Sequence, residues 1–530
     1  MSPLPHVGGL FGLEHHTRWH ALVKRGLYRG VLVIATAVLV YAIVWLQSKV
    51  GQSFATYNVA QRAIQWAELI WLAPVPLGVV LWIGWFVFAE PKQPRMVSVP
   101  QVPIGAAPRA RRPLRLVLRY VTRGDNVAVL RQSLASARTA FASYSGVAGE
   151  YVLEVVTERH LSLEPDVRVI VVPPEYVTPA KSRFKARALS FLQLQADTRP
   201  EDWLVYLDEE SGISAYLIAG IYEFVARNCA HSTSVPRLIG QGGILYQGGH
   251  WFFRGADALR TADDFGRFRI QYALGKPLFG IHGSYIVTPA LADGEISFDV
   301  GYDNSITEDA AWALRAWSKG WRFGWVRGCV HEQPPQHALD FIRQRARWLS
   351  GIRLVLRDPE VPLRFRACLG IFTALWQLSF LPFVVAALAL IYHVLPFAWM
   401  RIPADFAWAV FVLAYVLGAD VQAKYSQLNR DGTFQRRSRA RRAAGRLFAW
   451  AMAINYIWFA LLEAAAIVYS LIPRQGFFVI KKPSLATHDE DEESTLPLAS
   501  EDASVSTVEE TRLPAVPEAQ VSVPATSERS

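Results

Sequence analysis

The chain has 530 residues, more than one domain usually holds, and 52% of them are hydrophobic, with 18 tryptophans among them. This apolar share exceeds what a soluble globule needs and indicates that part of the chain lies in lipid. The formal charge of +10 does not favour nucleic-acid binding, because the Lys and Arg residues cluster beside apolar segments, where anionic lipid headgroups attract them. The three cysteines lie far apart and indicate neither a disulfide framework nor a zinc site.

Two uncharged apolar segments in residues 1–93 predict two transmembrane helices. They run from Gly30 to Gln47 and from Leu69 to Ala89, and each is long enough to cross a bilayer. Basic residues precede the first segment and follow the second, whereas few charges lie between them. The positive-inside rule therefore places both ends of this hairpin in the cytoplasm. Pro74 and Pro76 predict a kink at the start of the second helix.

Residues 94–113 are rich in proline and arginine and show no hydrophobic period, so we interpret them as a linker. From residue 114 to residue 365, predicted strands and helices alternate. This alternation favours a parallel α/β sheet with right-handed crossovers, the Rossmann-like architecture typical of nucleotide-binding domains. We predict strands at residues 114–121, 151–156, 167–172 and 204–208, and helices at residues 126–144, 183–195 and 213–228.

Residues 366–486 contain three further apolar segments, which predict about three more transmembrane helices, at residues 368–399, 406–419 and 447–472. The middle segment is short enough to be re-entrant. However, the basic loop from Lys424 to Arg446 belongs in the cytoplasm, which requires this segment to cross. Glu463 lies inside the last predicted helix, so we consider two explanations. It has a functional role, or it lies close enough to the helix end for water to reach its carboxylate.

The C-terminal residues 487–530 are acidic, rich in Ser, Pro and Val, and free of aromatic residues. This composition predicts a disordered tail. The number of spans places the tail outside the cell, whereas Lys481 and Lys482 argue for the inside, so the sequence leaves its side of the membrane open.

A short apolar run from Leu204 ends in three acids, Asp208, Glu209 and Glu210. Such a run predicts a buried strand whose end meets solvent, and ligands of open α/β sheets bind at strand ends. Asp208 and Glu210 are two residues apart and point to the same side of an extended chain. They are therefore candidate ligands for a hard divalent cation, Mg²⁺ or Mn²⁺, beside a diphosphate. A charged strand end without a ligand is the alternative.

Polar residues also follow the first two predicted strands, and they are candidates for nucleotide binding. Thr122 and Arg123 follow the first strand, and Glu158 follows the second. These ends would meet at one edge of a parallel sheet. Asp125 is equally well explained as the N-cap of the next helix.

The segment Thr307, Glu308 and Asp309 opens a stretch with helical spacing. Ser305 or Thr307 would cap this helix, and its dipole would favour the two acids in the first turn. A capped acidic helix start is a common structural feature, so catalysis is here one of two explanations. The catalytic explanation makes Asp309 a general base.

Gln344, Arg347 and Trp348 share one face of a predicted helix that begins near Leu339. They would present an amide, a guanidinium group that suits a diphosphate, and a ring that suits the face of a sugar. A basic helix at the membrane interface, with its tryptophan at the headgroups, is the alternative.

Together, a metal-binding carboxylate pair, a carboxylate base and an Arg/Trp helix before a membrane span are the parts that sugar transfer from a nucleotide diphosphate needs. These motifs, in this order, resemble those of the family 2 inverting glycosyltransferases, which have the GT-A fold. Residues 239–242, 283–285, 298–303 and 340–348 are also similar to the egghead-type β-1,4-mannosyltransferases. One difference from the wider family is Glu210, which stands where an aspartate is usual.

The resemblance implies a role for each matching residue. Asp309 would be the catalytic base, and Asp208 with Glu210 would hold the cation. Glu158 and Lys185 would lie at the nucleotide. The acceptor and diphosphate side would be formed by Gly283, Ser284, Glu308, Gln344, Arg347 and Trp348.

We therefore expect a multi-pass membrane protein with a cytoplasmic GT-A domain between N- and C-terminal transmembrane helices. It would transfer a sugar, with GDP-mannose as the favoured donor, to a lipid-linked or membrane-associated glycan, and inversion would give a β linkage. The expected partners are the donor, this acceptor and membrane lipids, but no nucleic acid. The alternatives are a processive polysaccharide synthase and a transporter or scaffold with an inactive transferase domain.

Overall fold

The computed structural model describes residues 10–50, 57–88, 94–104, 110–144, 149–195, 197–425, 427–428, 434–435 and 438–472. Residues 1–486 form one compact unit. The acidic tail predicted at residues 487–530, as well as Lys481 and Lys482, lie outside the described residues.

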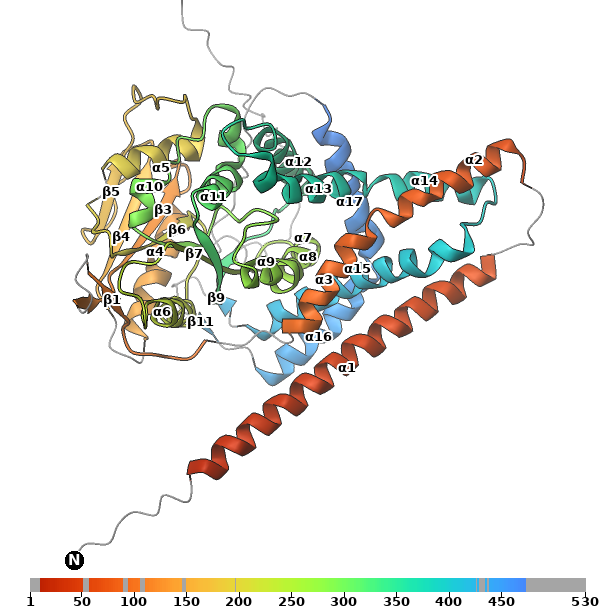
Figure 1. The fold of residues 1–530 in the computed structure, drawn as a ribbon, viewed down its shortest axis with the longest axis horizontal. Coiled ribbons are helices and arrows are strands. Elements are labelled where there is room, and N and C mark those ends of the chain that lie inside the picture. Colours follow the sequence, from red (N-terminus) through yellow and green to blue (C-terminus); the bar gives the residue numbers. More distant parts are fainter. Residues whose placement is uncertain are drawn as a thin grey trace, which may run out of the picture. The chain divides into compact units, whose positions relative to one another are not determined.

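The first unit contains a seven-stranded sheet with the order β5-β4-β3-β6-β8-β7-β9 (Figure 1). Its strands are β3 (Leu116–Thr122), β4 (Tyr151–Thr157), β5 (Val167–Val171), β6 (Trp203–Asp208), β7 (Leu238–Tyr246), β8 (Ile286–Pro289) and β9 (Arg322–Glu332). The four strands predicted from the sequence are β3 to β6, and all four are confirmed as parallel neighbours.

The predicted parallel sheet does not extend to β8, which runs antiparallel to both β6 and β7. A hydrophobic run marks a buried strand but does not specify its direction, because direction depends on the partner strand. The sheet is therefore mixed.

Helices cover both faces of this sheet, as Figure 1 shows. On one face, α4 (Val127–Ala142) and α6 (Ala215–Cys229) contribute to a core with buried side chains of β3 and β6. On the other face, α5 (Phe184–Leu194) and α11 (Glu308–Ser318) contribute to a second core. Shorter helices complete the domain: α7 (Trp251–Ala256), α8 (Ala258–Asp263), a π-helix (Asp264–Phe268), α9 (Arg269–Ala273), α10 (Leu291–Glu295), a 3₁₀ helix (Asp303–Thr307) and α12 (Ala338–Val355).

The register of the parallel strands brings their polar ends together. In the ladder between β3 and β6, Val121 pairs with Asp208, and in the ladder between β3 and β4, Thr122 pairs with Thr157. The residues that follow each strand therefore lie at one edge of the sheet, where ligands of α/β proteins bind.

Part of the predicted linker forms regular structure. A two-stranded antiparallel ladder joins β1 (Gln101–Pro103) to β2 (Arg111–Pro113), and Val102 is buried in the core beside α6. A second short ladder joins β10 (Gln427–Leu428) to β11 (Phe434–Gln435).

Four stretches of helix are long and apolar enough to cross a membrane: Lys24–Gln47, Val59–Phe88, Leu363–Ile391 and Ala398–Lys424. A fifth would combine Ala443–Ala451 with Tyr456–Ser470, which meet at 65°. The helices are α1 (Leu10–Val50), α2 (Val59–Ala67), a 3₁₀ helix (Glu68–Leu72), α3 (Val75–Phe88), α13 (Leu363–Leu378), α14 (Leu381–Ile391), α15 (Ala398–Lys424), α16 (Arg439–Ala453) and α17 (Tyr456–Ser470). The helical structure is interrupted between Leu72 and Val75, beside Pro74 and Pro76, and the predicted kink there stays a prediction.

The short segment predicted at residues 406–419 is only the centre of α15, which has 27 residues. The helix continues past charged residues because other polar groups pair with them. Gln47 of α1 donates to Asp405 Oδ1 at 2.8 Å and accepts from Arg401, while Asp420 pairs with Lys424 at 2.6 Å. The re-entrant alternative is therefore not supported by the length of the helix.

The apolar helices pack directly on the sheet domain. A Cβ atom on Gly84 of α3 would lie 2.3 Å from the carbonyl oxygen of Gly266, in the π-helix. A Cβ atom on Gly418 of α15 would lie 1.8 Å from the carbonyl oxygen of Ala258. Beside these contacts, Trp85 donates its ring N–H to the carbonyl oxygen of Ala262 at 2.9 Å. Backbones approach closely at both glycines.

Candidate active site

Lys185 lies at the centre of a group of carboxylates at the carboxyl end of β6. Its ammonium group donates to Asp208 Oδ1 at 2.5 Å and to the carbonyl oxygen of Gly283 at 2.8 Å. The same group lies 3.7 Å from Glu308 Oε1. Helix α5 thus holds one cation between the acid that ends β6 and an acid that begins α11.

Gly283 joins the two acidic motifs through its backbone. A Cβ atom at this position would lie 3.2 Å from Asp309 Oδ2 and 3.4 Å from both Glu308 Oε1 and Lys185 Nζ. The carboxylate of Asp309 therefore faces the group formed by Lys185 and Asp208. The sequence prediction that these separated motifs form one site agrees with this geometry.

Burial and charge shift the pKa values of this cluster. Burial raises the pKa of Glu308 to about 7, although the charge of Lys185 opposes the rise. Burial also raises the pKa of Asp309, although a hydrogen bond from the backbone N–H of Ala310 and the charge of Lys185 each act to lower this pKa. Burial alone would lower the pKa of Lys185, but Asp208 and Glu308 raise it above its ordinary value. A carboxylate with a raised pKa is a stronger base.

Arg347 of α12 lies within the electrostatic field of this cluster. Burial lowers the pKa of its guanidinium group, while Glu308, Asp309, Asp208 and Glu210 act in the opposite direction. One residue of the third motif, Arg347, therefore lies close enough to the acids of the other two motifs for their charges to interact. A guanidinium group beside these acids can bind an anionic group that approaches them.

Gln344 and Trp348 are engaged with a neighbouring residue that the sequence analysis missed. Arg345 is buried and donates to Gln344 Oε1 at 2.5 Å. Its guanidinium group lies over the ring of Trp348, 4.5 Å from the ring centroid, and pairs with Asp257. Arg345 thus orients the face of α12 that we predict to bind substrate, and its place between the two motif residues is the only sequence signal for this role.

Glu463 of α17 also pairs with Arg345, at 3.3 Å. The ionisable residue in the last predicted span therefore contacts the Arg/Trp helix directly. This ion pair gives Glu463 a structural partner, which neither hypothesis from the sequence anticipated.

Side-chain hydrogen bonds fix the loop that carries Gly283 and Ser284. Gln241 donates to the carbonyl oxygens of His282 and Ser284, at 2.8 and 3.0 Å. The hydroxyl groups of Ser284 and Ser211 lie 2.8 Å apart. Sequence reasoning did not assign Gln241 or Ser211, since both act across long sequence separations.

The candidate nucleotide contacts lie around the ends of β3 and β4. Thr122 donates its hydroxyl group to Glu209, and Glu158 pairs with Arg187 of α5 at 2.9 Å. Arg123 is exposed and lies 3.5 Å from Asp125. Thr122 and Glu158 are thus at the predicted edge, while a nucleotide contact stays a prediction for all three candidates.

Two expected helix caps differ in the structure. Asn126 caps α4, whereas Asp125 pairs with Arg159 at 2.6 Å. Neither expected hydroxyl group caps α11, because a 3₁₀ helix precedes it and Ser305 instead donates to the carbonyl oxygen of Gly301 at 2.6 Å. The cap prediction at Ser305 is therefore wrong, whereas Thr307 occupies the N-cap position of α11 but makes no side-chain capping hydrogen bond.

Asp208 and Glu210 are partly exposed and supply the oxygen ligands that Mg²⁺ and Mn²⁺ prefer. Among the described residues, no three His, Cys, Asp or Glu side chains gather as a metal-binding group. Mg²⁺ is commonly held by one or two carboxylates together with substrate phosphates. The residues present thus fit a cation that is bound together with a diphosphate.

The sequence matches known glycosyltransferases over most of the first unit. A family model described as "Glycosyl transferase family group 2" matches residues 203–421. The β-1,4-mannosyltransferases bre-3 of Caenorhabditis briggsae and Caenorhabditis elegans are each 32% identical over 382 residues, which cover 70% of this chain and 78% of each relative. The β-1,4-mannosyltransferase egh of Drosophila melanogaster is 36% identical over 269 residues, which cover 49% of this chain and 57% of the relative.

These matches and the GT-A-like mixed sheet define the class of the protein, which is a glycosyltransferase. The chain belongs to glycosyltransferase family 2, within the egghead-type group of that family. Among solved structures, S. aureus TarS 1-349 is 12% identical and covers 61% of this chain and 96% of its own, with a TM-score of 0.28. A TM-score this low adds nothing to the assignment.

Proposed function

We propose that the protein transfers mannose from GDP-mannose to a lipid-linked or membrane-associated glycan and forms a β linkage. The names of the relatives support mannose as the sugar. Candidate membrane spans precede and follow the sheet domain in the sequence, which supports an acceptor held at the membrane. We place the catalytic domain in the cytoplasm, because basic residues precede the first span and lie between the last two.

Asp309 is the proposed general base. It would accept the proton of the acceptor hydroxyl group as the oxygen attacks the anomeric carbon and the bond to the diphosphate breaks. A single displacement of this kind inverts the anomeric carbon. The observation that carries this proposal is the approach of Asp309 Oδ2 to the Gly283 backbone, beside the ammonium group that binds Asp208.

Asp208 and Glu210 are the proposed ligands of Mg²⁺ or Mn²⁺, which would neutralise charge on the leaving diphosphate when bound. Lys185 and Arg347 carry positive charge in the same cluster. They would bind and orient the diphosphate oxygens. Gln344 and Trp348, with Gly283, Ser284 and Glu308, would line the acceptor side.

Replacement of Asp309 by Asn tests the proposed base. Asn keeps the size of the side chain but accepts no proton at neutral pH, so we expect transfer to fall by roughly a hundredfold or more. Binding of GDP-mannose should stay within about twofold, because no ligand of the diphosphate is removed. Purified full-length protein in lipid, supplied with radiolabelled donor and extracted glycolipid acceptor, provides both measurements.

Asp303→Asn is a matched control, since Asp303 is exposed on the 3₁₀ helix just before this motif. It should retain transfer. A tenfold loss of donor binding in Asp309→Asn would instead assign this carboxylate to the donor site. The same assay, run with a panel of sugar nucleotides, would reject the mannose proposal if another donor were used more efficiently.

A further inference from the structure

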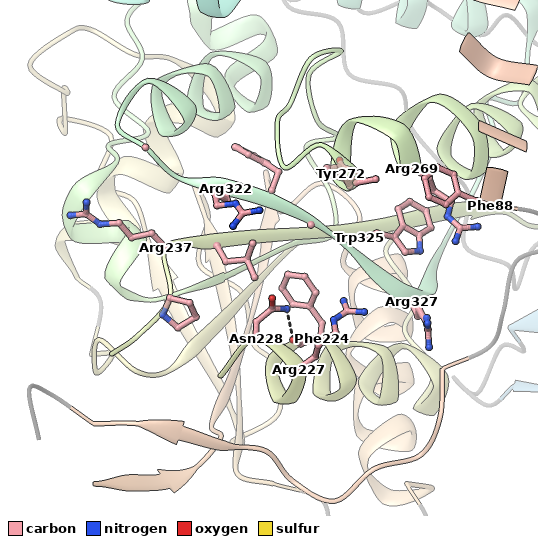
Figure 2. Close-up of a pocket in the computed structure, with 16 residues that line it drawn as sticks. Phe88, Phe224, Arg227, Asn228, Arg237, Arg269, Tyr272, Arg322, Trp325 and Arg327 are labelled. Atoms are coloured by element: carbon pink, nitrogen blue, oxygen red, sulfur yellow. Dashed lines mark hydrogen bonds between the residues drawn. The ribbon is translucent and has the colours of Figure 1, made fainter. Parts of the chain in front are cut away.

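A basic cavity of about 670 Å³ lies apart from the catalytic cluster and shares none of its residues. Figure 2 shows Arg237 and Arg322 at one end and Arg269, beside Phe88 and Trp325, at the other. Its size is that of a typical ligand site. Five arginines line it, and no acidic residue does: Arg227, Arg237, Arg269, Arg322 and Arg327.

Carboxylates from outside the lining neutralise only part of this charge. Arg237 pairs with Glu295 at 2.8 Å, and Arg327 pairs with Glu223 at 2.5 Å. Across the residues that the structure describes, no carboxylate pairs with the other three arginines of the cavity. Among the described side chains, three arginines of the cavity thus have no carboxylate to neutralise them, and the cavity would attract an anion.

Arg269 is the most confined of these cations. Its guanidinium carbon lies 4.7 Å from the ring centroid of Phe88 and 5.5 Å from that of Trp325. Burial lowers the pKa of Arg269 to about 10, and the charges of Arg327 and Arg25 act in the same direction. The group stays protonated at neutral pH, so the protein holds a positive charge next to two aromatic rings.

The cavity also lies at the end of a candidate membrane span. Phe88 is the last residue of the stretch Val59–Phe88, and Arg29 of α1 donates to the carbonyl oxygen of Phe86 at 2.9 Å. Aromatic rings and arginines at a span end are typical of the level of lipid headgroups. An anion that enters this cavity would therefore come most directly from the membrane surface.

We propose that this cavity binds the phosphate-bearing headgroup of an anionic phospholipid. Guanidinium groups bind phosphate through paired N–H donors, and the rings of Phe88 and Trp325 would contact the apolar part next to the headgroup. This inference goes beyond the proposed sugar transfer, although it rests on the proposed membrane orientation. Its readout is lipid binding, so it can fail while the transfer reaction is confirmed.

The test titrates full-length protein in detergent micelles with dioctanoyl phosphatidic acid, dioctanoyl phosphatidylcholine or inorganic phosphate. Native mass spectrometry and the rise in melting temperature report binding. We expect phosphatidic acid to bind at least tenfold more tightly than the other two. Arg269→Gln and Arg322→Glu should each weaken this binding by roughly tenfold or more, because each removes a charged hydrogen-bond donor.

Arg364→Gln is the matched control, because Arg364 is exposed and also lies over a phenylalanine at the start of a candidate span, 4.9 Å from the Phe365 centroid. It should bind like the wild type. Arg322 is exposed, so Arg322→Glu tests the cavity even if Arg269→Gln fails to fold. Equal binding of phosphatidylcholine, unchanged binding by Arg322→Glu, or inorganic phosphate binding as tightly as the lipid would each overturn the proposal.

Discussion

Glu308 and Asp309 are adjacent in sequence, and the first turn of α11 directs both toward Lys185 and the backbone of Gly283. The ammonium group of Lys185 thus lies close to several acids within a buried cluster. A set of carboxylates this close cannot all ionise without cost, and burial raises the pKa of both residues of the pair. The protonation state of Glu308 therefore affects the stability of the folded protein.

Glu308→Gln should change how stability depends on pH. The folded-state pKa of Glu308, about 7, lies above its ordinary value of 4.5, so its stabilising contribution is complete below pH 4.5 and is lost as the pH rises through about 7. Gln stays neutral and resembles the protonated acid. The melting temperature of the variant, relative to wild type, should therefore rise between pH 4.5 and pH 8 in metal-free buffer.

Melting curves of the full-length protein in detergent give this difference at each pH. Glu175→Gln, at an exposed position, controls for the loss of one negative charge and should show no such trend. A constant difference across this pH range would mean that Glu308 titrates alike in the folded and unfolded chain.

At the scale of elements, ion pairs connect α12 to the sheet domain and to the apolar helix α17. Arg345 of α12 is buried, and it pairs with Asp257, at the start of α8, and with Glu463 of α17. Removing one partner of a buried ion pair leaves the other charge without compensation. This three-residue network therefore couples α8, α12 and α17.

Arg345→Met should destabilise the protein by roughly 3–5 kcal/mol, because the carboxylate of Asp257 then stays buried and uncompensated. The double variant Arg345→Met with Asp257→Asn should lose markedly less, since the buried charge is removed as well. Thermal unfolding in detergent compares the two. If the double variant were as unstable as the sum of the single variants, the two side chains would not be coupled.

Sequence reasoning found the strands β3 to β6 and the helices α4 to α6, because uninterrupted or periodic apolar runs mark buried elements. It missed the direction of β8 and the length of α15, which depend on partners elsewhere in the chain. The candidate site also contains residues that local sequence marks and residues that depend on distant partners. Asp208, Asp309 and Arg347 lie in recognisable motifs, whereas Gln241 and Arg345 act through contacts 41 and 88 residues away.

At the scale of the whole molecule, the proposed orientation puts the start of α2 and the sheet domain on opposite sides of the membrane. Val59→Cys and Arg123→Cys place a thiol at an exposed position on each side. In sealed cells, a membrane-impermeant maleimide should label only Val59→Cys, because charged reagents do not cross the bilayer. Arg123→Cys should react only after permeabilisation.

Both variants would carry Cys368→Ala, since Cys229 and Cys329 are buried and Cys368 is partly exposed. Labelling of both positions from the same side would reject the orientation and, with it, a cytoplasmic catalytic domain. The chemistry of the carboxylate cluster would be unaffected by that result.

The backbones of Gly84, in α3, and Gly266, in the π-helix, lie in close contact. The carboxylate of Asp264, in this π-helix, also lies 2.5 Å from His282 Nε2, in the loop that carries Gly283 and Ser284. The loop that carries Gly283 is thus linked to the apolar helix α3 through the π-helix, and we expect this link to set the height of the proposed reaction centre above the membrane. We expect an acceptor to bring its terminal sugar to that height, so that the spacer between lipid anchor and sugar becomes a property on which the enzyme selects.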